Sequence, residues 1–169
     1  NESISKTGGA NASLTLQAHG NITVANGKTI SSSSGALNVL FNANSANTGG
    51  GIALGTGSGI TSNGGNITLG GGTALNGTGF ATADGSSALQ GIAMYSATIN
   101  AGGGNIVMNG LSPATTTPSA SSIAGILLST TTVSTSGAGT IAITGNNRIG
   151  NDTTGNGLVM TGGTITGGT

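Results

Sequence analysis

Among the few ionisable side chains of this 169-residue chain, we weigh His19, Asp84 and Asp152 as candidates for a general acid, general base or nucleophile. Two carboxylates flanking a sugar bond can cleave it, one as the acid and the other as the base or nucleophile. Both aspartates lie shortly before an apolar repeat, and a coiled repeat fold would place them two turns, about 10–15 Å, apart. That separation is long even for an inverting pair, so we expect no catalytic residue. His19 has no carboxylate near it in the sequence and is expected to be a solvated turn residue.

Glycine-rich stretches such as GGNITLGGG, at 64–72, have the composition of loops that bind phosphate. They lack the G-x-x-x-x-G-K-[ST] pattern, and no helical periodicity follows them, so we interpret the glycines as turn residues. Calcium-binding repeats need aspartates between their glycines, and these are absent here. The chain has no cysteine, which excludes thiolate ligands. We therefore expect no metal ion and no cofactor.

Runs of threonine, at 114–118 and 129–136, raise the question of a regular hydroxyl array of the kind that binds ice. Such an array needs a threonine at one outward position of every repeat. Position 68 is a threonine, but we place Asn38, Val107 and Ala142 at the equivalent positions. On this comparison the rank is broken, and we do not predict ice binding.

The composition is that of a structural protein. Charged residues make up only 4% of the chain and the formal net charge is zero, whereas nucleic-acid binding needs clustered cations and disordered tails are usually rich in charge. Glycine is abundant at 35 residues, but with two prolines and no three-residue period the chain is not collagen. No apolar run approaches the roughly 18 residues of a membrane span, and no signal-peptide pattern opens the chain. We expect a single segment, 1–169, excerpted from a longer polypeptide.

The elements that position these residues follow from an internal repeat with three apolar stations. Each unit has an apolar pair two residues apart, then a single apolar residue, then a second pair, and Gly, Asn and Ser separate the stations. A pair at i and i+2 places both side chains on one face of a strand. The predicted core consists of Ile22, Val24, Ile30, Leu37, Val39, Ile52, Leu54, Ile60, Ile67, Leu69, Ile92, Met94, Ile99, Ile106, Met108, Ile126, Leu128, Val133, Ile141, Ile143, Leu158, Met160 and Ile165.

Strands this short are stable only if successive units coil and stack their equivalent strands in parallel. The pattern therefore predicts an all-β fold, a right-handed parallel β-helix (a solenoid) of about five three-sided turns. The connections at 73–90, 111–124 and 146–156 vary in length and are predicted to project from one corner and to face partners. Asn66 and Asn105 occupy equivalent places and are predicted to be neighbours in a hydrogen-bonded ladder.

The strings GNITVANGKTISSSSGALNVLFNANS, from residue 20, and GGGIALGTGSGITSNGGNITLGGG, from residue 49, resemble the large exoproteins of two-partner secretion. These are the filamentous-haemagglutinin-like adhesins of Gram-negative bacteria, and the resemblance extends over most of the chain. It implies a right-handed β-helix, export through a dedicated outer-membrane transporter, and a role in adhesion or biofilm. Acidic residues that relatives often carry after LNV are absent, so the surface is expected to be almost uncharged.

The sequence thus predicts a non-enzymatic structural rod of a secreted or cell-surface adhesin. Its expected partners are the outer-membrane transporter during export and then a host cell, a neighbouring cell or another copy of the rod, but not nucleic acid. The leading alternative is a subunit of an extracellular filament that stacks end to end through its terminal turns. A β-helix enzyme acting on polysaccharide is a minor alternative.

Overall fold

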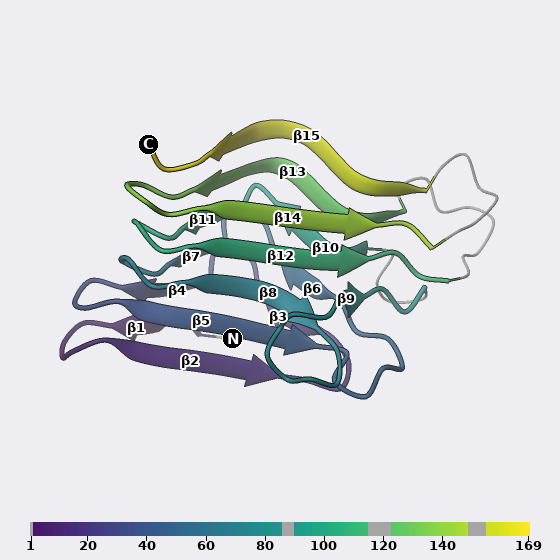
Figure 1. Cartoon of the computed structure of the whole chain (residues 1–169), viewed down its shortest axis with the longest axis horizontal. Coiled ribbons are helices and arrows are strands. Elements are labelled where there is room, and N and C mark those ends of the chain that lie inside the picture. The colour runs from purple at the N-terminus through teal and green to yellow at the C-terminus, as the bar shows by residue number, and fades with distance from the viewer. Residues whose placement is uncertain (1, 86–89, 115–122, 149–154) are drawn as a thin grey trace.

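The structure is a computed structural model that describes residues 2–85, 90–114, 123–148 and 155–169. Within these residues every regular element is a β-strand, and every ladder between the strands is parallel (Figure 1). The predicted all-β fold with parallel pairing is therefore confirmed, and the arrangement is consistent with a parallel β-solenoid.

The strands fall into three columns, one for each apolar station. The first column contains β3 (Ile22–Val24), β6 (Ile52–Leu54), β10 (Gln90–Tyr95) and the first parts of β13 (Ala124–Ser134) and β15 (Asn156–Thr166). The second contains β1 (Ile4–Lys6), β4 (Thr29–Ser32), β7 (Gly59–Thr61), β11 (Thr98–Asn100) and the second parts of β13 and β15. The third contains β2 (Ala12–Gln17), β5 (Leu37–Ala43), β8 (Ile67–Gly71), β12 (Ile106–Leu111) and β14 (Ile141–Asn146), with the short β9 (Ala81–Thr82) beside β12.

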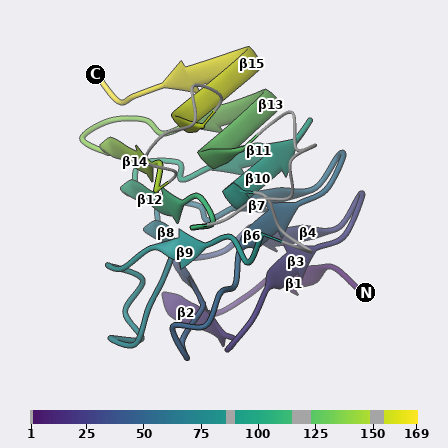
Figure 2. The same ribbon diagram turned by 90° about the vertical axis from the view of Figure 1, so that its right-hand side faces the viewer.

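Two of these columns are joined through long strands. Because β13 and β15 each run through the first and second columns, those columns form one sheet of nine strands, and the third column with β9 forms a sheet of six. Equivalent strands lie one above another in both views of the molecule (Figures 1 and 2). The sequence pattern did not predict the continuous strands, because it placed a turn between the first two stations of every unit.

The register aligns equivalent stations of successive units. In the first column Ile22 pairs with Ile52, which pairs with Ile92, and Ile92 pairs with Ile126. In the second column the same chain of pairs links Ile30, Ile60, Ile99 and Val133. The side chains at these positions are buried in one hydrophobic core, which is contributed by all three columns.

One predicted alignment is shifted by two residues. We aligned Leu37 and Val39 with the pair Ile67 and Leu69, but the structure pairs Ile67 with Val39 and Leu69 with Phe41. The reason is that LNVLF holds apolar residues at three alternate positions, so β5 contains two candidate pairs and the longer strand uses both. Leu37 is still buried and pairs with Ala12, while Phe41, which the prediction omitted, is fully buried.

The predicted core is not equally buried along the chain. Most of its members are buried, but Leu158, Met160 and Ile165 of β15 are 44, 39 and 41% exposed, and Ile141 and Ile143 of β14 are half-buried. Each of these strands has a partner on one side only among the described residues, β13 for β15 and β12 for β14. Their inward side chains therefore lack the second neighbouring unit that covers the others.

Asparagine side chains connect successive units at the start of the third column. Asn38 Oδ1 accepts a hydrogen bond from the Asn66 N–H, and Asn66 Oδ1 accepts one from the Asn105 N–H, both at 2.9 Å. Asn105 Oδ1 continues the series by accepting from the Thr140 N–H at 2.9 Å. As predicted, Asn66 and Asn105 are neighbours in a ladder, but its rungs join side chain to backbone rather than side chain to side chain.

Buried hydroxyls form a second series, at the corner between the second and third columns. Ser32 Oγ donates to the Gly35 carbonyl at 2.8 Å, Ser62 Oγ to the Gly65 carbonyl at 2.5 Å. Thr135 Oγ1 donates to the Gly104 carbonyl at 2.6 Å, so this third hydroxyl bonds to the corner of the preceding unit rather than to its own. The backbone carbonyls at these tight corners lie beside the apolar interior, where water cannot reach them. The hydroxyls supply the hydrogen bonds that these carbonyls would otherwise lack. The sequence analysis did not detect this series.

Glycine at the same corner serves two different purposes. Gly64 has a φ of 92°, a conformation that residues with a Cβ rarely adopt. Its neighbour Gly65 needs glycine for space instead, because a Cβ there would lie 2.3 Å from the Leu37 carbonyl oxygen of the preceding unit. The interpretation of these glycines as turn residues explains Gly64 but not Gly65.

Candidate functional site

The three candidate catalytic side chains do not form a site in the described part of the chain. His19 is exposed between β2 and β3, and Asp84 is exposed shortly after β9. Asp152 lies outside the described residues, so the predicted distance between the two aspartates stays a prediction. Among the described residues, no group of three or more His, Cys, Asp or Glu side chains is close enough to hold a metal ion.

The few cations are bound in different ways. The Lys6 ammonium donates to the carbonyl oxygens of Gly9 and Ser34 and so belongs to the corner of its unit. Lys28 Nζ lies 3.6 Å from the Glu2 carboxylate in an ion pair that is largely exposed. For the Arg148 guanidinium, the described residues supply no ion pair and no hydrogen bond. Among the cations in the described part of the chain, Arg148 is the one whose side chain has no such partner there.

The segment 73–85 folds back onto the end of the third column, although it was predicted to project. Gly50 and Thr82 form an antiparallel bridge, and Gly71 and Gly79 form another. Ala81 is buried by this arrangement because β9 pairs with the end of β12. The described part of this connection is therefore mostly a cover for the end of the sheet.

A hollow of about 370 Å³ lies where this cover meets the neighbouring connections, and six of the residues that line it are Asn44, Asn47, Thr73, Phe80, Thr82 and Arg148. Asn44 is fixed in a left-handed conformation, with a φ of 53°, and its Oδ1 accepts a hydrogen bond from the Gly49 N–H at 2.7 Å. Ser112 Oγ accepts from the Arg148 N–H at 2.8 Å and so ties two connections together. The lining offers amides, hydroxyls, one guanidinium and one aromatic ring, which suit a polar or anionic group, but no acid–base pair.

A smaller hollow of about 250 Å³ lies on the outer face of the third column, between β2, β5 and β8 and the loop that carries Asn76. Gln17 Nε2 donates to the Leu75 carbonyl at 3.3 Å, and Asn42 Oδ1 accepts from the Gly77 N–H at 3.0 Å. These bonds hold the loop across the face. The outer face of the third column is therefore partly covered by the chain itself.

Position 68 on this covered face was the basis for rejecting a threonine array. The structure aligns Thr68 with Leu40, Val107 and Ala142. The residue equivalent in the first unit is Leu40 rather than the predicted Asn38, because of the shift in β5. The rank at this position is broken, as predicted.

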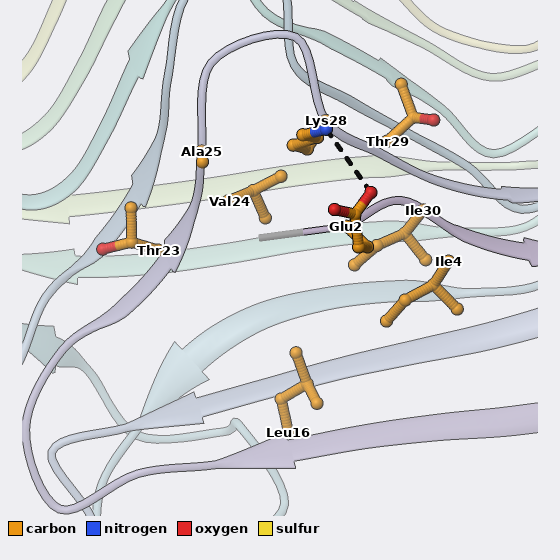
Figure 3. A pocket seen from close by; sticks show the side chains of 9 residues that line it. All are labelled: Glu2, Ile4, Leu16, Thr23, Val24, Ala25, Lys28, Thr29 and Ile30. Atoms are coloured by element: carbon orange, nitrogen blue, oxygen red, sulfur yellow. Dashed lines mark ion pairs between the residues drawn. The ribbon is translucent and has the colours of Figure 1, made fainter.

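A third hollow, of about 100 Å³, lies at the end of the column stack near the N-terminus (Figure 3). Ile4, Leu16 and Ile30 line it from the second and third columns, and the Lys28–Glu2 ion pair lies at its margin. Ile4 is 43% exposed. This hollow is the uncovered end of the apolar interior rather than a shaped ligand site.

Comparison with known protein families, with curated proteins and with solved structures gives no match to this chain. In the part of the chain that the structure describes, no helix is long and apolar enough to cross a membrane.

Proposed function

We propose that this chain is a non-enzymatic structural rod of a secreted or cell-surface bacterial adhesin, folded as a right-handed parallel β-helix. The observation that carries the proposal is the unbroken register of apolar stations, in which each unit pairs with the next in all three columns. Backbone hydrogen bonds and apolar side chains repeat along one direction, so each unit stiffens its neighbours without enclosing a substrate cleft.

The resemblance to the exoproteins of two-partner secretion supplies the biological setting of this proposal. Such a rod would leave a Gram-negative cell through its outer-membrane transporter and then hold the cell to a host cell, to a neighbouring cell or to another rod. The near absence of charge fits this role, because an uncharged surface does not repel a second surface. The hollow that carries Arg148 is the described place where a polar or anionic group of a partner fits best.

Deletion of one complete unit from the full-length protein tests the rod. Removal of 92–125 joins Gly91 to Ile126, which occupies the same register position as Ile92. We expect the β-sheet circular dichroism, cooperative unfolding and cell adhesion all to persist. Removal of 92–105 is the matched control, because it joins the first column to the third, and it should abolish both folding and adhesion.

The two deletions also distinguish a rod from a receptor-binding or catalytic segment. If the chain lacking 92–125 folds but no longer mediates adhesion, that unit binds a partner directly and the spacer role is wrong. We expect the native protein not to cleave glycans. Replacing Asp84 or Asp152 with asparagine should therefore change nothing in a glycan-cleavage assay. A glycan-cleaving activity that either substitution abolishes would establish the enzyme alternative.

A filament subunit is the second candidate function, because the parallel ladders that join one unit to the next would serve equally well between the end units of two chains. The mass of the natural mature chain separates the two candidates. A chain of thousands of residues supports the adhesin, and a short mature subunit supports the filament.

A further inference from the structure

The hollow of about 370 Å³ that Arg148 lines is formed where the strands of the third column end. Those strands are parallel, so the connections that follow β5, β8 and β14 all leave the stack at the same edge (Figure 1). Asn44 comes from the connection after β5, and Arg148 comes from the one after β14. Phe80 and Thr82 come from the segment after β8. Side chains from three separate segments thus line one hollow.

Asn44 brings to this hollow a buried amide with an unused donor. It is 2% exposed, and its Oδ1 accepts a hydrogen bond from the Gly49 N–H at 2.7 Å. Among the described residues its Nδ2 has no hydrogen-bond acceptor, yet the atom retains some contact with solvent. A buried donor without a partner costs free energy unless water or a ligand accepts its hydrogen bond. The Asn44 amide is therefore available to an acceptor in the hollow that it lines.

Arg148 supplies the positive charge of the lining. Its N–H donates to the buried Ser112 Oγ at 2.8 Å, which fixes the backbone from which the side chain extends. Among the described residues the guanidinium makes no ion pair and no hydrogen bond. Neither of the carboxylate residues in the described part of the chain, Glu2 and Asp84, lines the hollow. The described lining therefore presents a single positive charge to a ligand.

Phe80 and Thr82 add an aromatic surface and a hydroxyl group. The backbones of Thr82 and Gly50 exchange two hydrogen bonds, at 2.6 and 2.9 Å, which hold the segment in place. Thr82 Oγ1 donates to the Phe80 carbonyl at 3.2 Å, so its oxygen is left as an acceptor. Phe80 is half-buried in this fixed segment. An aromatic ring and polar groups of both kinds, donors and acceptors, therefore line the same hollow.

We propose that this hollow binds an acidic sugar residue, that is, a six-membered sugar ring that carries one carboxylate. The Arg148 guanidinium pairs with the carboxylate, and charge-assisted hydrogen bonds of this kind are the strong ones. The Asn44 amide and the Thr82 hydroxyl match the hydroxyl groups of the sugar, and the Phe80 ring matches its apolar C–H face. A volume of about 370 Å³ lies within the range of small-ligand sites, roughly 300–1,000 Å³.

Other ligands use less of this lining. A phosphate ion would leave the Phe80 ring without a role, and a neutral sugar would leave the guanidinium unpaired. A nucleotide carries roughly 1.5 to 2 negative charges on its terminal phosphate at pH 7, whereas the described lining holds one cation. Sugar binding deepens the proposed function and rests on it in one respect, because the hollow must meet a partner of the rod. A single open hollow binds weakly, so cell adhesion of the full-length protein does not depend on it.

The test is saturation-transfer NMR on the full-length protein with methyl β-D-glucuronide as the probe. Methyl β-D-glucopyranoside is the matched ligand, because it has the same ring with a CH₂OH group in place of the carboxylate. We expect the glucuronide to bind at least about fivefold more tightly than the glucoside, and than acetate, which has the charge without the ring. Arg148→Gln should remove the preference for the glucuronide, and Phe80→Leu should weaken the binding of both sugars.

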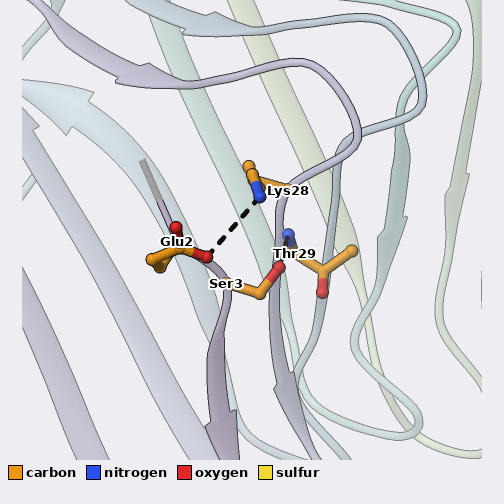
Figure 4. A network of polar contacts seen from close by, with 4 residues as sticks. All are labelled: Glu2, Ser3, Lys28 and Thr29. Atoms are coloured by element: carbon orange, nitrogen blue, oxygen red, sulfur yellow. Dashed lines mark hydrogen bonds and ion pairs between the residues drawn. The ribbon is translucent and has the colours of Figure 1, made fainter.

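Each of the two variants has a matched control away from the hollow. Lys28→Gln removes one positive charge at the ion pair with Glu2 (Figure 4). Tyr95→Leu removes an aromatic ring that is 41% exposed and does not line the hollow. Both controls should bind the glucuronide like the native protein. Arg148→Gln should also keep the native melting temperature, because the Arg148 side chain is exposed.

The acidic-sugar site is refuted if the glucuronide does not bind, or if the glucoside or acetate binds equally well. Tighter binding of AMP than of the glucuronide would assign the hollow to a nucleotide and overturn it as well. Equal losses in Arg148→Gln and Lys28→Gln would do the same, because they would reduce the effect to net charge. None of these results bears on the rod itself, which the deletion of 92–125 tests through folding and cell adhesion.

Discussion

The outer faces of the second and third columns differ although their inner faces follow the same pattern. On the second column, most outward positions carry hydroxyl groups, and the threonines among them, such as Thr98 and Thr132, are exposed. On the third column, the loop around Asn76 lies across the strands, and the outward rank at Thr68 changes type from unit to unit. Packing in the core thus dictates the inward residues of both columns, whereas the outward residues are set by what each face contacts.

The largest expected effect contrasts the two sides of a single strand. Ile99→Asp places a carboxylate in the apolar interior and should destabilise the protein by more than about 4 kcal/mol, which would prevent folding of this region. Thr98→Asp, one residue earlier and outward, should change the free energy of unfolding by less than about 0.5 kcal/mol. Urea unfolding followed by circular dichroism measures both. A larger loss for Thr98→Asp than for Ile99→Asp would mean that β11 faces the other way.

Glycine substitutions should have the next largest effect, and they test how closely the units approach at the start of the third column. Gly65→Ala puts a methyl group against the Leu37 carbonyl oxygen and should cost about 1–3 kcal/mol. Gly20→Ala is the control, because a Cβ at Gly20 has no atom within 4 Å and its φ is not positive. Thermal melting should show a clear drop for the first variant and little change for the second. A neutral Gly65→Ala would contradict the close stacking of the units.

The asparagine ladder should contribute less than the close packing. Asn66→Ala removes the acceptor of the Asn105 N–H and should cost about 0.5–1.5 kcal/mol. Thr61→Ala, on the second column, removes a hydroxyl that has no described partner and should leave the unfolding free energy nearly unchanged. Chemical denaturation of both variants compares a structural polar column with a solvent-facing one. If Thr61→Ala proved as costly as Asn66→Ala, the Thr61 hydroxyl would have a structural role.

The ion pair between Lys28 and Glu2 should contribute least to stability. Glu2 is 91% exposed, and pairs of this kind typically contribute between about 0 and 1 kcal/mol. Lys28→Gln should therefore leave the melting temperature at moderate salt almost unchanged. A large loss that persists at high salt would show that Lys28 supports the fold by packing rather than by charge.

Sequence periodicity was sufficient to predict the parallel strands and most of the inward residues, because alternate burial along short strands leaves a strong signal. It failed where that signal is ambiguous. LNVLF allows two registers, and only the three-dimensional pairing of Phe41 with Leu69 selects one.

The outward hydroxyls of the second column were not singled out in the sequence for a related reason. They stand two residues apart within a unit and then recur only in the next unit, so no local run of threonines marks them. The obvious run at 114–118 drew attention instead, and most of it lies outside the described residues. The sequences T-I-S, T-I-N and T-I-T become a pattern once the second column has been aligned unit by unit.

Hydrogen bonds that run along the stacking direction have a mechanical consequence. A tensile force on the two ends of the rod pulls the units apart in the direction of these bonds, so the terminal unit should peel away before its neighbours rather than the whole rod yielding at once. Equivalent residues of neighbouring units are 25 to 40 positions apart in the ladders, and each peeled unit therefore releases on the order of 100 Å of extended chain. Under flow, such a rod would lengthen in steps and dissipate load, so that a bond at its tip is spared the full force.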